Sequence, residues 1–206
     1  MDDAEAMFNN WANDPEVTKY MTWNPHKDIK ETKAILSRWI KEYKDPKTIR
    51  SAITLKDSGE LIGSIDIVGY LYGDPKIGYC LSRKYWNQGI MTEALGTFLD
   101  YLTSIGYDRV FIEAHVDNIA SNRVIQKNGF KFLREDTRIM SEVKKEKVRI
   151  NLYGKYIDVD DYLYDEDEDD EEDPEELTIE ERRERAEEEG WDEEEMDLEE
   201  FEDYFM

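Results

Sequence analysis

The chain has 206 residues, of which 51 are Asp or Glu and 27 are Lys or Arg, a length that predicts one ordinary domain with an extension. Its single cysteine excludes an intramolecular disulfide, and with only two histidines the chain offers no cysteine- or histidine-based metal cluster, so no metal is expected. No apolar run is long enough to span a membrane and the acidic N-terminus has no signal-like apolar region, so the sequence predicts a cytoplasmic protein without a membrane partner.

Charge divides the chain at about residue 158. Residues 158–206 hold 29 of the 51 acidic residues, whereas residues 1–157 hold 24 basic and 22 acidic residues. The near-neutral body has no basic footprint for nucleic acid, and the acidic end would repel one. We expect a domain over 1–164, an acidic disordered linker over 165–173 and an acidic, aromatic-containing, helix-prone tail over 174–206. The tail either folds onto a partner or only keeps the protein soluble.

The first half of the body reads as helices followed by strands. Capping residues and apolar spacing predict a helix after Asp2 or Asp3, a helical start at Pro15 and an amphipathic helix over 29–43. Alternating residues between turn signals then predict strands at 51–55, 61–68 and 76–82. Three such strands in succession form an antiparallel meander.

A turn with one glycine, Gly89, leads from the strand at 76–82 into an apolar-periodic helix over about 90–105. The first N–H groups of a helix have no internal partner, and the helix dipole favours negative charge there. Glycine lets the backbone approach a phosphate closely. This stretch therefore predicts a site for a pyrophosphate-bearing ligand.

The second half of the body alternates strands and helices. We expect a strand at 110–116, a short helix at 120–127 closed by Asn128-Gly129, a strand at 130–139 and a last strand at 156–164. Residues 141–149 are polar, and their pattern determines no element. The helix between the strands at 76–82 and 110–116 makes a crossover, so these two strands are expected to be parallel. The predicted fold class is α+β, a mixed and mostly antiparallel sheet flanked by helices.

Several motifs in this order resemble the RimJ/RimL branch of the GNAT N-acetyltransferases. They are Ile77-Gly78-Tyr79, residues 85–94 (YWNQGIMTEA), residues 117–124 (DNIASNRV) and Asn128-Gly129-Phe130. Residues 14–17 with Tyr20 and Trp23 are also similar to the N-terminal segment of that branch. The resemblance implies a twisted sheet with a splayed parallel strand pair, acetyl-coenzyme A (acetyl-CoA) as donor and a primary amine as acceptor. The acidic tail and the missing strand before the first helix depart from the family pattern.

The resemblance also implies where the cofactor lies. Main-chain N–H groups of the loop and helix start would bind the pyrophosphate, here those of Asn87, Gln88, Gly89, Ile90, Met91 and Thr92. The pantetheine arm would run between the splayed strands and bond the main chain near Leu81 and Ser82. Asn118 matches the family asparagine that reaches the cofactor, although an asparagine there could instead cap the following helix.

The chemistry needs a base, because an alkyl ammonium must lose a proton before it attacks a thioester. Glu113 is the predicted base, since it lies in the central strand near the splay; alternatively it lies on the other face in a structural ion pair. His115 shares its face and is either a proton relay or an interior histidine. Lys76 stands where many related acetyltransferases have a carboxylate before the Ile-Gly-Tyr motif.

The oxyanion and the departing thiolate need donors as well. A main-chain N–H near Leu81 would serve the oxyanion. Many GNAT proteins protonate the thiolate with a tyrosine, but Ile125 stands at that position, and the resemblance to the RimL-like branch implies Ser121 instead. Ser121 could equally bond its own backbone at the helix start. Cys80 is expected to be an inert strand cysteine.

The predicted function is transfer of the acetyl group of acetyl-CoA to a primary amine by direct transfer in a ternary complex. The acceptor could be a protein N-terminus, a polyamine or a small-molecule amine, and the acidic tail favours a basic protein or a polycation. The alternative is a non-catalytic or CoA-sensing interaction protein whose tail binds a basic partner. The oligomeric state is left open, a homodimer being one option.

Overall fold

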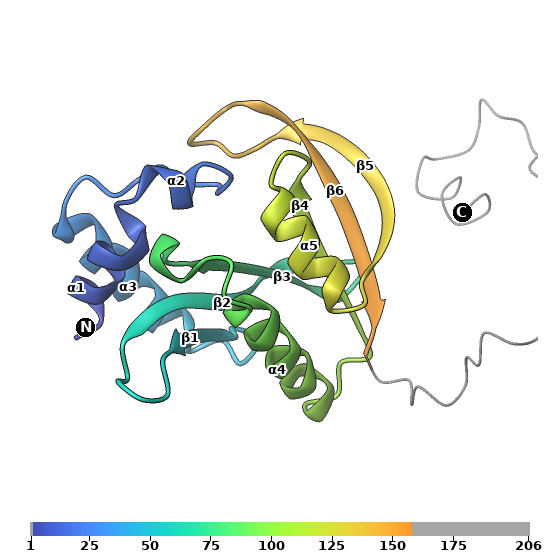
Figure 1. Cartoon of the computed structure of the whole chain (residues 1–206), viewed down its shortest axis with the longest axis horizontal. Coiled ribbons are helices and arrows are strands. Elements are labelled where there is room, and N and C mark those ends of the chain that lie inside the picture. Colours follow the sequence, from blue (N-terminus) through green and yellow to red (C-terminus); the bar gives the residue numbers. More distant parts are fainter. Residues whose placement is uncertain (1, 158–206) are drawn as a thin grey trace, which may run out of the picture. The chain divides into compact units, whose positions relative to one another are not determined.

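The computed structural model describes residues 2–157, which form one six-stranded sheet with helices around it (Figure 1). The helical segments are α1 (Ala4–Met7), the π-helical turn η1 (Phe8–Ala12), α2 (Pro15–Thr18), α3 (Ile29–Glu42), the 3-10 turn η2 (Arg83–Tyr85), α4 (Ile90–Ser104) and α5 (Ile119–Lys127). The strands are β1 (Arg50–Thr54), β2 (Leu61–Leu71), β3 (Asp74–Leu81), β4 (Arg109–His115), β5 (Lys131–Ile139) and β6 (Lys147–Tyr156). The predicted linker and tail lie outside the described residues.

The predicted meander is confirmed. β1 pairs with β2 and β2 pairs with β3, both antiparallel, and each pair contains one register irregularity. β2 runs to Leu71, three residues further than the sequence pattern indicated, because the partner strand β3 starts at Asp74 and pairs with that extension. The sheet order is β1-β2-β3-β4-β6-β5, so β3 and β4 lie at its centre.

The parallel step between β3 and β4 is also confirmed, and it is short. Only Lys76 pairs with Phe111 and Ile77 with Ile112, after which β3 runs on to Leu81 and β4 to His115 without pairing to each other. The two strands therefore diverge over their C-terminal halves. This divergence leaves strand edges with main-chain groups that no neighbouring strand satisfies, which is the predicted splay.

The two faces of the sheet differ in character. The helix α4 buries Leu95, Phe98 and Leu102 against a core that includes Ile77 of β3 and Ile112 of β4. A second apolar cluster forms around Met7, Trp11, Ala12 and Val17 of the N-terminal segment, with Trp39 of α3 and Cys80 of β3 packed against it. Figure 1 shows α1, α2 and α3 grouped apart from α4 and α5.

One strand lies elsewhere than the sequence pattern predicted. β6 covers Lys147–Tyr156, which begins inside the polar range 141–149 whose pattern determined no element. Only Tyr156 falls within the predicted last strand at 156–164. The signal was present, since Val148, Ile150 and Leu152 are buried and alternate with more exposed neighbours. The charged residues on the wet face of this strand masked the alternation. Residues 158–164 lie outside the described part of the chain.

Candidate active site

The phosphate end of the site is the loop before α4. Asn87 and Gly89 both have positive φ, of 59° and 81°, and Gly89 occupies the position before the first helical residue, Ile90. No side chain caps this helix, and no atom lies within 4 Å of where a Cβ of Gly89 would be. The first turn of α4 thus has no side-chain cap, and the chain is open at Gly89, which fits a pyrophosphate bound by the first N–H groups of the helix. The roles of Asn87, Gln88, Gly89, Ile90, Met91 and Thr92 in binding stay predictions.

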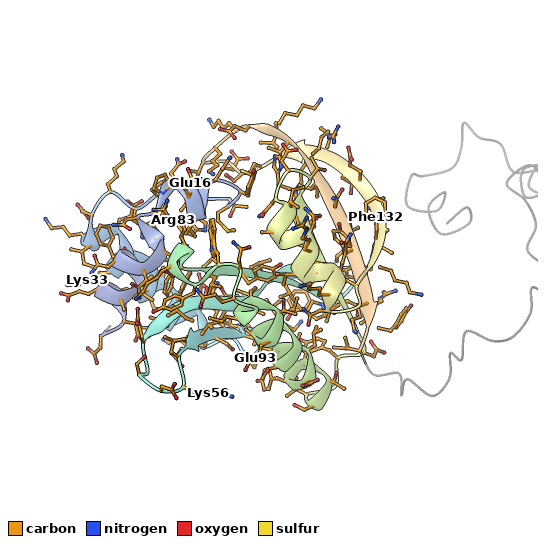
Figure 2. All side chains as sticks on the ribbon, in the orientation of Figure 1. Glu16, Lys33, Lys56, Arg83, Glu93 and Phe132 are labelled. Atoms are coloured by element: carbon orange, nitrogen blue, oxygen red, sulfur yellow. The ribbon has the colours of Figure 1, made fainter. Side chains whose placement is uncertain are left out.

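Basic side chains stand around this loop. Lys56 and Glu93, both labelled in Figure 2, are exposed and lie 3.8 Å apart beside the first turn of α4. Arg83, also labelled, contacts Asp14 at 3.1 Å, and Lys84 lies 3.8 Å from Glu60. The side chains of all three cations are more than half exposed, so they can attract a phosphate-bearing ligand over a distance.

A cavity of about 700 Å³ opens where β3 and β4 diverge. On one side it is lined by Asn118 and Ser121 of α5, and on the other by the aromatic residues of the N-terminal segment. Between them its wall is formed by β2, β3 and β4. The cavity thus reaches both faces of the sheet through the splay, so two ligands can meet there from opposite sides.

Leu81 presents its N–H group to this splay. The N–H of Ser82 donates to the carbonyl of Ile62 in β2 at 2.7 Å, and successive N–H groups of a strand point to opposite edges. The Leu81 N–H therefore points toward β4, while its carbonyl accepts from the Trp86 indole at 2.8 Å. Ser82 differs, because its carbonyl also accepts from Tyr85, so both of its main-chain groups are already bonded. Leu81 therefore keeps one main-chain donor toward the splay, which is the donor that the predicted oxyanion contact near Leu81 would use.

Ser121 contacts Tyr79, a residue for which the sequence predicted no role in the reaction. The hydroxyls of Tyr79 and Ser121 lie 2.9 Å apart, although they are 42 residues apart in the chain. Burial raises the pKa of Tyr79 to about 12, and the hydrogen bond to Ser121 only partly offsets this. Tyr79 therefore stays protonated at neutral pH. Together the two hydroxyls form a donor pair on the α5 side of the cavity, and the presence of Tyr79 in the Ile-Gly-Tyr motif was the available signal.

Asn118 caps α5, which is the alternative role that its residue type allowed. Its Oδ1 accepts from the N–H of Ser121 at 3.2 Å. A second asparagine, Asn122, is buried and fully bonded: it donates to the carbonyls of His115 and Asn118 and accepts from Tyr153 at 2.7 Å. Asn122 thereby fixes the start of α5 relative to β4 and β6. Because a fully satisfied buried network is rigid, Asn122 positions Ser121.

Glu113 lies on the opposite side of the cavity from Ser121, in a cluster with two cations. Lys76 contacts its carboxylate at 3.0 Å, and Arg138 of β5 binds both of its oxygens in a bidentate pair. The side chain of Glu113 is 15% exposed. Glu113 is thus part of an ion pair, as the alternative interpretation expected. It nevertheless lies on the face of the sheet that lines the cavity, as the interpretation of Glu113 as the base required.

We expect Glu113→Gln to lower the free energy of unfolding by about 1–2 kcal/mol, because it leaves Lys76 and Arg138 close together without their carboxylate. Urea denaturation measures this loss. Adding Lys76→Met should recover part of it. A Glu113→Gln variant as stable as the wild type, whose activity recovers at high pH, would instead identify Glu113 as the base.

His115 is held as an interior histidine. Its Nδ1 accepts from the main-chain N–H of Asp117 at 3.1 Å, and its ring packs against Tyr20 at 4.9 Å between centroids. Its side chain lines the cavity and is 15% exposed. The Asp117 amide and the Tyr20 ring together fix the orientation of the imidazole at the cavity wall.

The carboxylate that sequence reasoning missed is Asp66 of β2. It lies opposite Gly78 in the β2–β3 register and lines the cavity. Burial raises the pKa of Asp66 to about 6. The positive charge of Arg50, the Ser51 amide and the Ser64 hydroxyl each lower this pKa, but by less than burial raises it. The alternation of residues along β2 shows that Asp66 is a polar residue on one face of the strand. The alternation alone could not show which face of the sheet lines the cavity.

We expect Asp66→Asn to stabilise the protein above pH 6 and to leave its stability unchanged near pH 3. A raised folded pKa means that the folded state holds this proton more tightly than the unfolded chain, so the ionised carboxyl costs stability that grows as pH rises from about 4 to 6. The full cost is about 3 kcal/mol. Melting temperatures of both proteins from pH 3 to 8 measure it, and a constant difference across that range would contradict it.

Known proteins match this chain over most of the described part. The family described as "Acetyltransferase (GNAT) domain" matches residues 1–131. The chain is 28% identical over 153 residues to the protein named "Uncharacterized N-acetyltransferase p20" from Bacillus licheniformis, a match that covers 73% of this chain and 83% of the relative. It is 34% identical over 103 residues to the ribosomal-protein-serine acetyltransferase of Escherichia coli, covering 48% of this chain and 56% of that protein.

Solved structures agree with the fold. RimL, the ribosomal L7/L12 alpha-N-protein acetyltransferase in complex with coenzyme A, superposes with a TM-score of 0.67 at 21% identity, covering 77% of this chain and 91% of RimL. At this identity the likeness concerns the fold. Within residues 2–157, no helix is long and apolar enough to cross a membrane, and no group of His, Cys, Asp and Glu is placed to hold a metal.

Proposed function

Because this chain belongs to the GNAT acetyltransferase family, we propose that it moves the acetyl group of acetyl-CoA to a primary amine by direct transfer in a ternary complex. The observation that carries the proposal is the cavity through the splay, which reaches both faces of the sheet. A donor bound along the strand edges on the α4 and α5 side would meet an acceptor that enters from the N-terminal segment.

The donor side fits acetyl-CoA. Free N–H groups at the start of α4 suit its pyrophosphate, and the open edges of β3 and β4 suit the amides of its pantetheine arm. Acetyl-CoA supplies a thioester carbonyl that an amine can attack. The Leu81 N–H points into the splay and would donate to that carbonyl oxygen as negative charge develops on it, and a main-chain donor needs no reorganisation during the reaction.

The departing thiolate would receive a hydrogen bond or a proton from the hydroxyls of Tyr79 and Ser121. Tyr79 and Ser121 share a hydrogen bond on the donor side of the cavity, and both are neutral donors at neutral pH. Either hydroxyl can hydrogen-bond the departing thiolate or give it a proton, which the partner hydroxyl would then help to restore. This assigns Ser121 the predicted role and adds Tyr79 to it.

Direct transfer is favoured over an acyl-enzyme. Cys80 is the only cysteine of the chain and lines the cavity, but burial raises its pKa to about 11. At neutral pH the thiol is therefore protonated, whereas the thiolate is the nucleophile. No step of the proposed reaction uses Cys80.

We propose a protein N-terminus as the acceptor, ahead of polyamines and small amines. The support is the E. coli relative, whose name places its acetyl group on a ribosomal protein, and RimL, named as an α-N-protein acetyltransferase. A binding protein without activity is the other candidate, and the feature that favours it is the acidic end of the chain, residues 158–206, with 29 acidic residues.

Release of the coenzyme A thiol over a panel of peptides, polyamines and small amines tests the function. The full chain and a chain ending at residue 164 are compared, with acetyl-CoA binding measured by calorimetry. We expect binding in both and turnover with at least one peptide amine. Binding without turnover would favour the interaction protein, and absence of both would contradict the family chemistry for this chain.

A further inference from the structure

Two polar atoms on the acceptor side of the cavity have no partner. Among the buried side-chain nitrogen and oxygen atoms of residues 2–157, only Asp66 Oδ1 and Arg50 Nε lack a hydrogen bond. Both residues line the cavity, and because the two atoms themselves are buried, a ligand would meet them once the side chains turn toward it. A buried acceptor and a buried donor left unpaired are costly, and such groups in a folded protein call for an explanation.

Besides the Ser51 main-chain amide named above, the contacts of the Asp66 carboxylate are long. Asp66 Oδ2 lies 3.4 Å from the Ser64 hydroxyl and 3.8 Å from Arg50 Nη1, and the Asp66 side chain is 10% exposed. Ser64 in turn lies 3.6 Å from the thiol of Cys80, the residue before Leu81. The Asp66 carboxylate is therefore connected through Ser64 to the part of β3 that faces the splay, and χ2 rotation can turn either oxygen toward it.

Arg50 is held in place from α3. Its Nη2 donates to Glu42 at 2.8 Å, its guanidinium stacks 4.7 Å from the Trp39 ring, and its carbonyl accepts from the Tyr43 hydroxyl. These contacts leave the Nε–H uncommitted. Arg50, Glu42, Tyr43 and Cys80 are thus the titratable or charged groups that surround Asp66 from β1, α3 and β3.

The cavity does not suit a polycation. Its charged lining consists of four cations, Arg38, Arg50, Lys76 and Arg138, and two carboxylates, Asp66 and Glu113. Glu113 is already bound by Lys76 and Arg138. Asp66 can therefore accept one ammonium group, and a second ammonium would lie among cations without a carboxylate of its own.

Resting on the proposed acetyl transfer, we propose that Asp66 and Arg50 form the acceptor site: Asp66 binds the ammonium group and takes its proton, and Arg50 Nε–H binds the oxygen of a carbonyl next to it. An α-amino group followed by a peptide carbonyl offers one donor and one acceptor, which matches the two unpaired atoms in hydrogen-bond type. This arrangement distinguishes a peptide N-terminus from a simple alkylamine or a polyamine.

The proton and bond changes balance. Asp66 takes one proton from R–NH₃⁺ and later releases it to solvent, the amine nitrogen forms a bond to the acetyl carbon, and the carbon–sulfur bond breaks. The nitrogen loses a second proton, which ends on the thiolate. The pKa of a free α-amine is about 8 and that of an alkylamine is about 10. Proton transfer to a carboxylate whose pKa is about 6 therefore costs less free energy from the α-ammonium group than from an alkylammonium group.

The test measures kcat/KM with three amines: leucinamide, 3-methylbutylamine, which has the same side chain but no carbonyl, and 1,4-diaminobutane. Each amine is assayed with the wild type, Asp66→Asn and Arg50→Lys. Asp66→Asn is close in shape, so it should fold. We expect it to lower kcat/KM about 100-fold at pH 7, with the loss shrinking as pH approaches the pKa of the amine and acetyl-CoA affinity unchanged. Arg50→Lys keeps the charge but removes Nε, and should lower the preference for leucinamide over 3-methylbutylamine about tenfold.

Asp74→Asn is the control, because Asp74 pairs with Arg109 at the start of β3 and does not line the cavity. Its kcat/KM should match that of the wild type. Four results would each overturn the acceptor site. In Asp66→Asn they are a kcat/KM equal to that of the wild type, or a loss of kcat/KM that is equal at every pH. The other two are an unchanged preference for leucinamide in Arg50→Lys and a wild type that prefers the diamine. Absence of turnover by the wild type with any amine would overturn the proposed function itself.

Discussion

Tyr79→Phe is expected to lower kcat about 10- to 100-fold while leaving the KM for acetyl-CoA within about twofold. The Tyr79 hydroxyl lies 2.9 Å from Ser121 and keeps its proton because burial raises its pKa to about 12. A hydrogen bond to a charged group contributes about 1.5–3 kcal/mol, and the departing thiolate is the charged group that this hydroxyl would meet. Steady-state rates with saturating amine measure the effect.

The partner residue supplies the sharper test. Ser121→Ala should cost about as much as Tyr79→Phe, and the double variant should cost no more than the worse single variant, because residues that act as one unit are not additive. Tyr107→Phe is the control: it removes a hydroxyl that contacts Tyr70 at 3.3 Å and does not line the cavity. Wild-type kcat in Tyr79→Phe, or full additivity in the double variant, would rule out the pair as the thiolate donor.

Gly89→Val is expected to weaken acetyl-CoA binding about tenfold or more. Gly89 has a φ of 81°, a conformation that a β-branched residue avoids, so valine should move the loop and redirect the N–H groups at the start of α4. Calorimetric titration with acetyl-CoA and with coenzyme A measures the change in dissociation constant.

Gly106 provides a matched control at the other end of the same helix. Its φ is 93°, and as at Gly89 no atom lies within 4 Å of where a Cβ would be. Gly106→Val should therefore lose similar stability and keep the affinity for acetyl-CoA. Equal losses of affinity in both variants would mean that the effect comes from general destabilisation, and that the loop does not bind the pyrophosphate.

Much of the fold could be predicted because its signals are local. The amphipathic spacing of α3, the meander of β1 to β3 and the glycine before α4 each depend on a few adjacent residues. The parallel placement of β4 followed from the crossover through α4. β6 escaped prediction because Lys147 and Arg149 make its wet face look like a loop, although Val148 and Ile150 keep period two.

The site was harder to predict because it depends on residues far apart in the chain. The contact of Tyr79 with Ser121 spans 42 residues, and the bidentate pair of Arg138 with Glu113 spans 25. The sequence placed Glu113 in the central strand near the splay and left its face open, and it could not show that Lys76 and Arg138 converge on it. Nor could spacing show that Asp66 keeps an unpaired oxygen, since this depends on how Arg50 is held by Glu42 and Trp39.

The central claim is that the splay between β3 and β4 brings a thioester and an amine together without a covalent enzyme intermediate. Mass spectrometry of one reaction mixture, containing the protein, acetyl-CoA and a short peptide with a free N-terminus, tests it most directly. We predict one acetyl group on the peptide nitrogen for each coenzyme A thiol released, and a protein of unchanged mass when the peptide is left out. Thiol release without an acetylated amine, or an acetylated Cys80, would contradict this account.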